Sequence, residues 1–102
     1  MALKNNEETR LQQRIQTYLQ SLGAYEFKVH GSAYMKAGIP DLIVCLDGKF
    51  IGIECKVGYN KPSELQKAHG RMIEKAGGVF IVAYSVQDVK EGLINAGFNI
   101  VS

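Results

Sequence analysis

The sequence predicts a single α/β domain with the element order α-β-β-β-α-β-α and a mixed central sheet flanked by helices. Helical segments are indicated by apolar residues that recur at helical spacing and are followed by glycine. A tight-turn dipeptide, Asp47-Gly48, joins two apolar segments and is typical of a two-residue hairpin. Residues 79–84 are almost continuously apolar, which favours a buried strand in a partly parallel sheet.

The size and composition of the chain favour one domain over residues 1–102. Of these residues 46% are hydrophobic, and the formal net charge of +2 permits a polyanionic partner without requiring one. No apolar run approaches the roughly 18 residues that span a bilayer, so we expect a cytoplasmic protein with no membrane contact. Cys45 and Cys55 have no zinc-site spacing and are expected to be reduced thiols in the core.

The first helix is predicted over residues 6–22, with Gly23 ending it. Its apolar stripe consists of Leu11, Ile15, Leu19 and Leu22. On the same helical wheel Glu8 lies near the centre of the stripe and Glu7 lies to its side, so Glu8 should face the core. Alternatively, both acids only complement the positive end of the helix dipole.

The remaining elements follow from alternation and capping signals. Residues 24–30 alternate between apolar and charged side chains, as in a half-buried strand. Ser63 and Gln66 have the capping-box spacing and begin a helix. Its inward residues are predicted to be Leu65, Ala68, Met72, Ile73 and Ala76. Ser85 is the predicted N-cap of the last helix, which Gly97 ends.

The hairpin turn predicts which residues lie opposite one another. If Asp47 and Gly48 are the two loop residues, cross-strand partners have numbers that sum to 95, and Asp41 opposes Glu54. Lys56 lies on the same face. Because opposed like charges destabilise a sheet, this arrangement indicates a bound divalent cation. The alternative is an exposed ion pair of Glu54 and Lys56, with Asp41 as a turn residue.

The residue types on this face suit phosphodiester hydrolysis. Asp41, Glu54 and Glu8 offer the carboxylate oxygens that Mg²⁺ prefers. A metal with bound water can supply the nucleophile, relieve phosphoryl charge and support the leaving oxygen. Lys56 can hold the attacking water or stabilise developing negative charge.

These residues resemble the motif of the PD-(D/E)XK nuclease superfamily and, more closely, its VRR-NUC branch. The shared features are a glutamate on the first helix, the turn His30-Gly31-Ser32, the segment Lys36-Ala37-Gly38-Ile39-Pro40-Asp41, the strand Glu54-Cys55-Lys56, and Gln66. They span nearly the whole chain. The resemblance implies a restriction-endonuclease-like core and a Mg²⁺- or Mn²⁺-dependent endodeoxyribonuclease without a small-molecule cofactor.

The resemblance also implies a role for each site residue. The metal ligands would be Glu8, Asp41, Glu54 and the backbone carbonyl of Cys55. Lys56 would be the catalytic lysine. Gln66 would approach the active site, although its capping box already gives it a local role.

Short, free-standing members of this branch, often phage-encoded, resemble homodimers that act on branched DNA such as four-way (Holliday) junctions. If the chain is phage-encoded, we expect it in the host cytoplasm. The candidate DNA contacts are Lys28, His30, Ser32, Lys36, Lys61, Lys67 and Arg71. Two alternatives stay open, namely a catalytically inactive nucleic-acid-binding module on the same fold and an unrelated α/β interaction domain.

Overall fold

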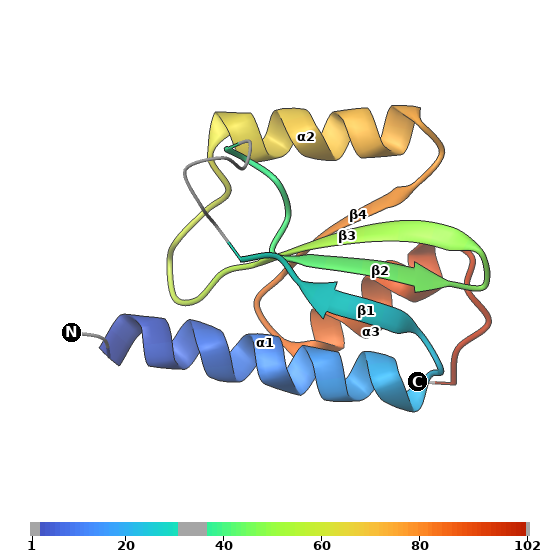
Figure 1. Ribbon diagram of the computed structural model, residues 1–102, viewed down its shortest axis with the longest axis horizontal. Coiled ribbons are helices and arrows are strands. Elements are labelled where there is room, and N and C mark those ends of the chain that lie inside the picture. The colour runs from blue at the N-terminus through green and yellow to red at the C-terminus, as the bar shows by residue number, and fades with distance from the viewer. Residues whose placement is uncertain (1–2, 31–36, 102) are drawn as a thin grey trace.

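The computed structural model describes residues 3–30 and 37–101 and has the predicted order of elements (Figure 1). These are α1 (Leu3–Ser21), β1 (Tyr25–Lys28), β2 (Leu42–Leu46), β3 (Lys49–Cys55), α2 (Glu64–Lys75), β4 (Val79–Ala83) and α3 (Val86–Asn95). No helix within these ranges is long and apolar enough to cross a membrane.

The sheet is mixed, as predicted, with the strand order β1-β2-β3-β4. Strand β2 is antiparallel to both β1 and β3, and β4 runs parallel to β3. Asp47 and Gly48 both have positive φ, 52° and 76°, which a type I′ turn requires. Every pair between β2 and β3 sums to 95, from Leu46 with Lys49 to Leu42 with Ile53, so the predicted register is confirmed.

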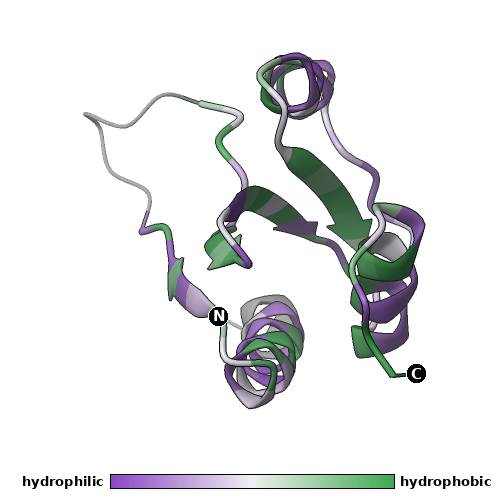
Figure 2. Cartoon of the chain, turned by 90° about the vertical axis from the view of Figure 1, so that its right-hand side faces the viewer, coloured by the Kyte–Doolittle hydropathy of each residue, from purple (hydrophilic) through white to green (hydrophobic). Residues whose placement is uncertain are grey.

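The core lies between the sheet and the helices α1 and α3, which cover the same face (Figure 1). Successive residues of a strand point to opposite faces, so Ile51, Ile53 and Cys55 of β3 all enter this core, where each is fully buried. Figure 2 shows the hydrophobic colour concentrated in the sheet, between α2 on one side and the other two helices on the other. This face therefore supplies most of the burial that stabilises the fold.

The opposite face is covered only over β3 and β4, where α2 packs closely. A Cβ atom on Gly70 would lie 2.4 Å from the ring of Phe80, so only glycine fits at this position of the helix. A Cβ on Gly38 would similarly lie 2.8 Å from Leu65 and 2.9 Å from His69. The helix thus holds the segment that leads to Asp41 as well as the sheet.

Two of the predicted buried faces are wrong. Leu65 and Met72 of α2 and its C-cap Ala76 are exposed, because the helix approaches the sheet through Gly70 and Ile73, and of these two only Ile73 belongs to the predicted stripe. Cys45 is also exposed rather than in the core, because it lies on the α2 side of the sheet, where the helix does not reach over β2. Both cysteines are free thiols, as predicted.

The strand β1 has the predicted alternation, but its aromatic side faces solvent. Tyr25 is 73% exposed and Phe27 47% exposed. Their neighbour Glu26 points toward α1, where it accepts hydrogen bonds from Gln16 Nε2 at 2.8 Å and Gln20 Nε2 at 2.9 Å. These bonds fix which side of the strand faces α1, because a one-residue shift in register would exchange its two faces.

Candidate active site

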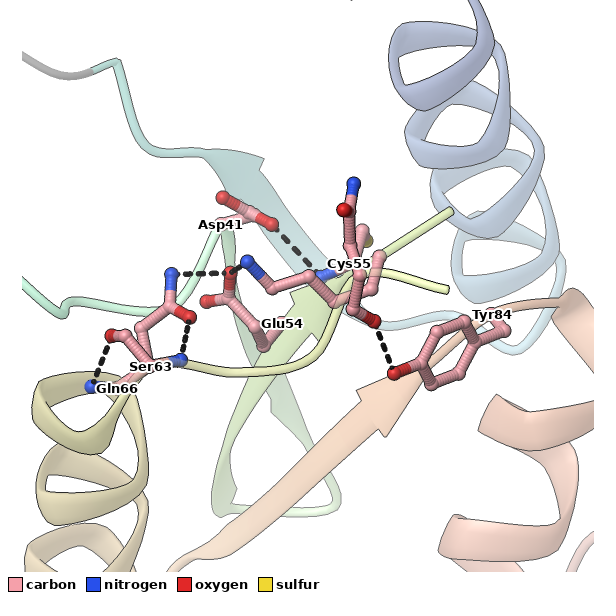
Figure 3. Close-up of polar contacts among 8 residues, drawn as sticks. Asp41, Glu54, Cys55, Ser63, Gln66 and Tyr84 are labelled. Carbon is pink, nitrogen blue, oxygen red and sulfur yellow. Dashed lines mark hydrogen bonds and ion pairs between the residues drawn. The ribbon is translucent and has the colours of Figure 1, made fainter. Parts of the chain in front are cut away.

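Asp41 is fixed at the open end of the β2–β3 hairpin. Its carboxylate oxygen Oδ2 accepts a hydrogen bond from the backbone N–H of Cys55 at 2.8 Å (Figure 3). Its own carbonyl accepts one from the N–H of Val29, also at 2.8 Å. The residue therefore extends the pairing of β1 with β2 by one step and places its side chain at the end of β3.

Glu54 is the buried charged residue of this site. It lies on the α2 side of β3 and is only 1% exposed. Its oxygen Oε2 accepts a hydrogen bond from Gln66 Nε2 at 2.8 Å, and Lys56 Nζ lies 3.5 Å from the same oxygen. Its other oxygen, Oε1, is buried and has no hydrogen-bond partner among the described residues.

The pKa of Glu54 is raised to about 7, first by burial and second by the nearby charge of Asp41, against the opposite effect of Lys56. The ammonium group of Lys56 therefore does not offset the combined effect of burial and of the second carboxylate on the pKa of Glu54. A divalent cation would both offset this charge and coordinate the unpartnered oxygen of Glu54, since hard cations prefer carboxylate oxygens. The donor set of this site fits Mg²⁺ or Mn²⁺.

The side chain of Gln66 makes two separate sets of contacts, one in the capping box and one with Glu54. Its side-chain oxygen accepts a hydrogen bond from the N–H of Ser63 at 2.8 Å, and its N–H donates to Ser63 Oγ at 3.1 Å, which completes the capping box. The side-chain nitrogen of the same amide binds Glu54. The start of α2 is therefore tied directly to the carboxylate of Glu54 (Figure 3).

Glu8 of α1 lies on the side of the helix that faces the sheet. It is half-buried, whereas Glu7 is exposed, in agreement with the helical-wheel prediction. Burial raises the pKa of the Cys55 thiol, and the charges of Asp41, Glu54 and Glu8 raise it further in that order, so Glu8 is close enough to act on the end of β3. Over residues 3–30 and 37–101, however, no three Asp, Glu, His or Cys side chains form a ready metal-binding group.

The candidate DNA contacts lie in different surroundings. His30, Lys61 and Arg71 are exposed, and Lys28 is half-buried near Cys55, whose pKa its charge lowers. Lys67 forms an ion pair with Glu64 at 3.3 Å. Ser32 and Lys36 lie outside the described residues.

Two residues near the site carried no functional signal in the sequence. Tyr84, just after β4, donates its hydroxyl to the carbonyl of Asn60 at 2.6 Å, in the loop between β3 and α2 (Figure 3). Tyr84 and Asn60 are 24 residues apart. Only the parallel pairing of β3 with β4 brings them together, and no local pattern encodes that contact.

Comparison with known proteins identifies the fold. No protein-family model matches the sequence, and no curated protein is significantly similar to it. Among solved structures, the chain is similar to a VRR_NUC domain with a TM-score of 0.73 and 26% identity, over 90% of this chain and 98% of that one. It is also similar to Hjc, a Holliday junction resolvase of Archaeoglobus fulgidus, with a TM-score of 0.60 and 18% identity, over 76% and 67% of the two chains.

The chain therefore has the PD-(D/E)XK nuclease fold, and the resemblance drawn from its motifs is confirmed at this level. The restriction-endonuclease-like core predicted for it is confirmed as well.

Proposed function

We propose that the chain is a metal-dependent endodeoxyribonuclease that hydrolyses phosphodiester bonds. The observation that carries this proposal is the buried, unpartnered oxygen of Glu54, which lies beside Asp41 and Lys56 at the open end of a nuclease-fold sheet. A structural ion pair would not need a second, half-buried carboxylate, because the extra charge only adds desolvation cost.

The residues that would hold the metal are Asp41 and Glu54, together with Glu8 and the backbone carbonyl of Cys55. Mg²⁺ or Mn²⁺ bound there would activate water and relieve negative charge on the phosphoryl group. The chain itself contributes the orientation of these ligands. Gln66 fixes Glu54, and the N–H of Cys55 fixes Asp41, so both carboxylates are positioned before substrate arrives.

Lys56 is the residue that acts on the substrate in this proposal. Its ammonium group lies beside Glu54 and is partly exposed, so it can reach a phosphate bound at the site. There it would donate hydrogen bonds to the attacking water or to a phosphoryl oxygen that gains negative charge. Replacing it would remove this stabilisation while leaving the core intact.

Cleavage assays with matched variants test the activity. We expect the wild type to nick DNA with Mg²⁺ or Mn²⁺ and not with EDTA, and we expect Asp41→Ala and Lys56→Ala each to lower the rate by about 10²-fold or more. Circular dichroism would check that both variants stay folded. If the folded wild type binds DNA with either metal but never cleaves it, the chain is a catalytically inactive nucleic-acid-binding module on this fold.

We propose branched DNA, such as a four-way junction, as the preferred substrate. The solved structure of Hjc, named as a Holliday junction resolvase, supports this choice through its similar fold. A panel of linear, flap, splayed and four-way substrates of equal length would test it. Equal cleavage of all four would contradict selectivity for structure without affecting the proposed chemistry.

We also propose that two copies of the chain associate through an exposed patch on the α2 side of the sheet. This open patch consists of Tyr25, Phe27, Cys45 and Phe50. Cys45 pairs with both Tyr25 and Phe50 across the strands, so the patch is continuous over β1, β2 and β3. Large contiguous apolar patches mark interaction sites, and a two-fold contact between identical patches is the commonest arrangement in homo-oligomers.

A further inference from the structure

The loop between β3 and α2 carries an aromatic side chain that packs on nothing in the described part of the chain. Tyr59 is 101% exposed, which makes it the most exposed large hydrophobic residue there. It follows the proposed catalytic lysine, Lys56, by three residues in the same loop. A fully exposed aromatic ring contributes nothing to the core, so its position beside the active site points to a ligand contact.

Hydrogen bonds hold this loop at its start and around its tip. At its start the N–H of Lys56 binds the carbonyl of Ala83 at 3.0 Å. Around the tip the N–H of Asn60 binds the carbonyl of Val57 at 3.2 Å, and Tyr84 Oη binds the carbonyl of Asn60 at 2.6 Å. Tyr59 is therefore presented by an ordered turn, which lowers the entropy cost of using it in binding.

The charge of the loop suits a nucleic acid. Residues 56–63 include Lys56 and Lys61 but no acidic residue. Lys61 is exposed two positions after Tyr59. A basic loop with an aromatic ring at its tip is the combination with which proteins bind unpaired nucleotides, since lysines contact phosphates and the ring stacks on a base.

We propose that Tyr59 stacks on an unpaired or unstacked nucleobase beside the scissile phosphate, and that this contact favours branched DNA over a continuous duplex. The inference rests on the proposed nuclease function. In a continuous duplex each base is stacked between its neighbours and offers no free face. At a branch point or a splayed end a base face is available to the ring.

Variants within this one loop separate stacking from charge. Binding is measured by fluorescence anisotropy on splayed and linear DNA of equal length, with Ca²⁺ replacing Mg²⁺ to prevent cleavage. We expect Tyr59→Ala to weaken binding to splayed DNA about tenfold, with linear DNA unchanged, and we expect Tyr59→Phe to bind like the wild type. Lys61→Ala is the matched control and should weaken binding to both DNAs alike. The slope of the logarithm of its binding constant against the logarithm of salt concentration should be smaller by about one.

The absence of tryptophan from the sequence allows a direct test of the contact. Tyr59→Trp introduces a single tryptophan, whose emission splayed DNA should quench by stacking and linear DNA should leave unchanged. Equal quenching by both DNAs, or none by either, would overturn the proposal. The proposal would also be overturned if Tyr59→Ala bound splayed DNA as tightly as the wild type does. A loss of affinity in Tyr59→Phe as large as that in Tyr59→Ala would overturn it too, because it would indicate a contact of the hydroxyl group.

These measurements remain informative if the proposed function fails. A wild type that never cleaves DNA contradicts the nuclease, whereas the anisotropy and quenching experiments report on Tyr59 without any cleavage. Conversely, a wild type that cleaves branched DNA and a Tyr59→Ala variant with the same preference would contradict only the role of Tyr59.

Discussion

The two faces of β3 differ in chemistry although they belong to one strand of seven residues. Toward α1 and α3 the strand presents Ile51, Ile53 and Cys55, all fully buried among apolar neighbours. Toward α2 it presents Phe50, Gly52 and Glu54. Phe50 is half exposed, Gly52 packs closely against the helix, and Glu54 is a buried carboxyl group.

The difference shows how the site is stabilised. The apolar face supplies burial, and that burial lets the other face keep a carboxylate whose desolvation is costly. The fully covered face thus stabilises the fold, while the partly covered face provides the proposed chemistry and the proposed contact between copies. Substitutions on the two faces should therefore have effects of different kinds. Their effects on the free energy of unfolding should decrease from the apolar face, through the charged site, to the open patch.

The largest loss of stability is expected on the apolar face. Ile53→Ala should lower the free energy of unfolding by about 2–5 kcal/mol, because it leaves a cavity in a fully buried place. Phe50→Ala on the same strand is the control and should cost the monomer less than about 1 kcal/mol, since its ring is half exposed there. Urea denaturation measures both, and similar losses in the two variants would contradict the assignment of the faces.

The charged face should make the metal-free protein less stable as pH rises. The pKa of Glu54 is about 7 in the folded chain, against an ordinary value of 4.5, so the folded state binds the proton more tightly than the unfolded state. Its contribution to stability is therefore present below pH 4.5 and is lost as pH rises through 7, by about 3 kcal/mol.

Denaturation in EDTA at pH 5 and pH 8 measures this change. Glu54→Gln, which cannot ionise, should remove that part of the pH dependence and should abolish cleavage. Mg²⁺ or Mn²⁺ added at pH 8 should stabilise the wild type but not the variant. A variant with the same pH dependence as the wild type would show that Glu54 does not titrate in this range.

A smaller effect separates the two roles of Gln66. Gln66→Ala and Ser63→Ala both break the capping box, and each should cost about 1 kcal/mol of stability. Only Gln66→Ala also removes the hydrogen bond to Glu54, so it should lower the cleavage rate a further 10- to 100-fold. Equal rates in the two variants would mean that the bond to Glu54 has no part in activity.

The smallest effect on the folded chain is expected at the open patch. The double variant Tyr25→Ser and Phe27→Ser should change the unfolding free energy of the monomer by no more than about 0.5 kcal/mol per site, because both rings are exposed. Its mass in solution, measured by light scattering, should nevertheless fall from that of a dimer to that of a monomer. Tyr59→Ala, outside the patch, should stay dimeric, and a monomeric wild type would rule out the proposed interface.

The sequence was sufficient for the features that depend on neighbouring residues. The turn at Asp47-Gly48 set the register of β2 and β3, and that register predicted Asp41 and Glu54 together at one end of the hairpin. The capping box of α2 was equally local. Each of these follows from backbone conformations and spacings within a few residues, which tertiary packing does not change.

The tertiary structure alone decided which side of each element is buried. The rotation of α2 depends on the contact of Gly70 with Phe80 of β4, and the outward aromatic face of β1 depends on the bonds of Glu26 to α1. The bond of Gln66 to Glu54 and the bond of Tyr84 to the β3–α2 loop also join separate elements. Periodicity shows that an element has two faces, but only its packing partners determine which face is covered.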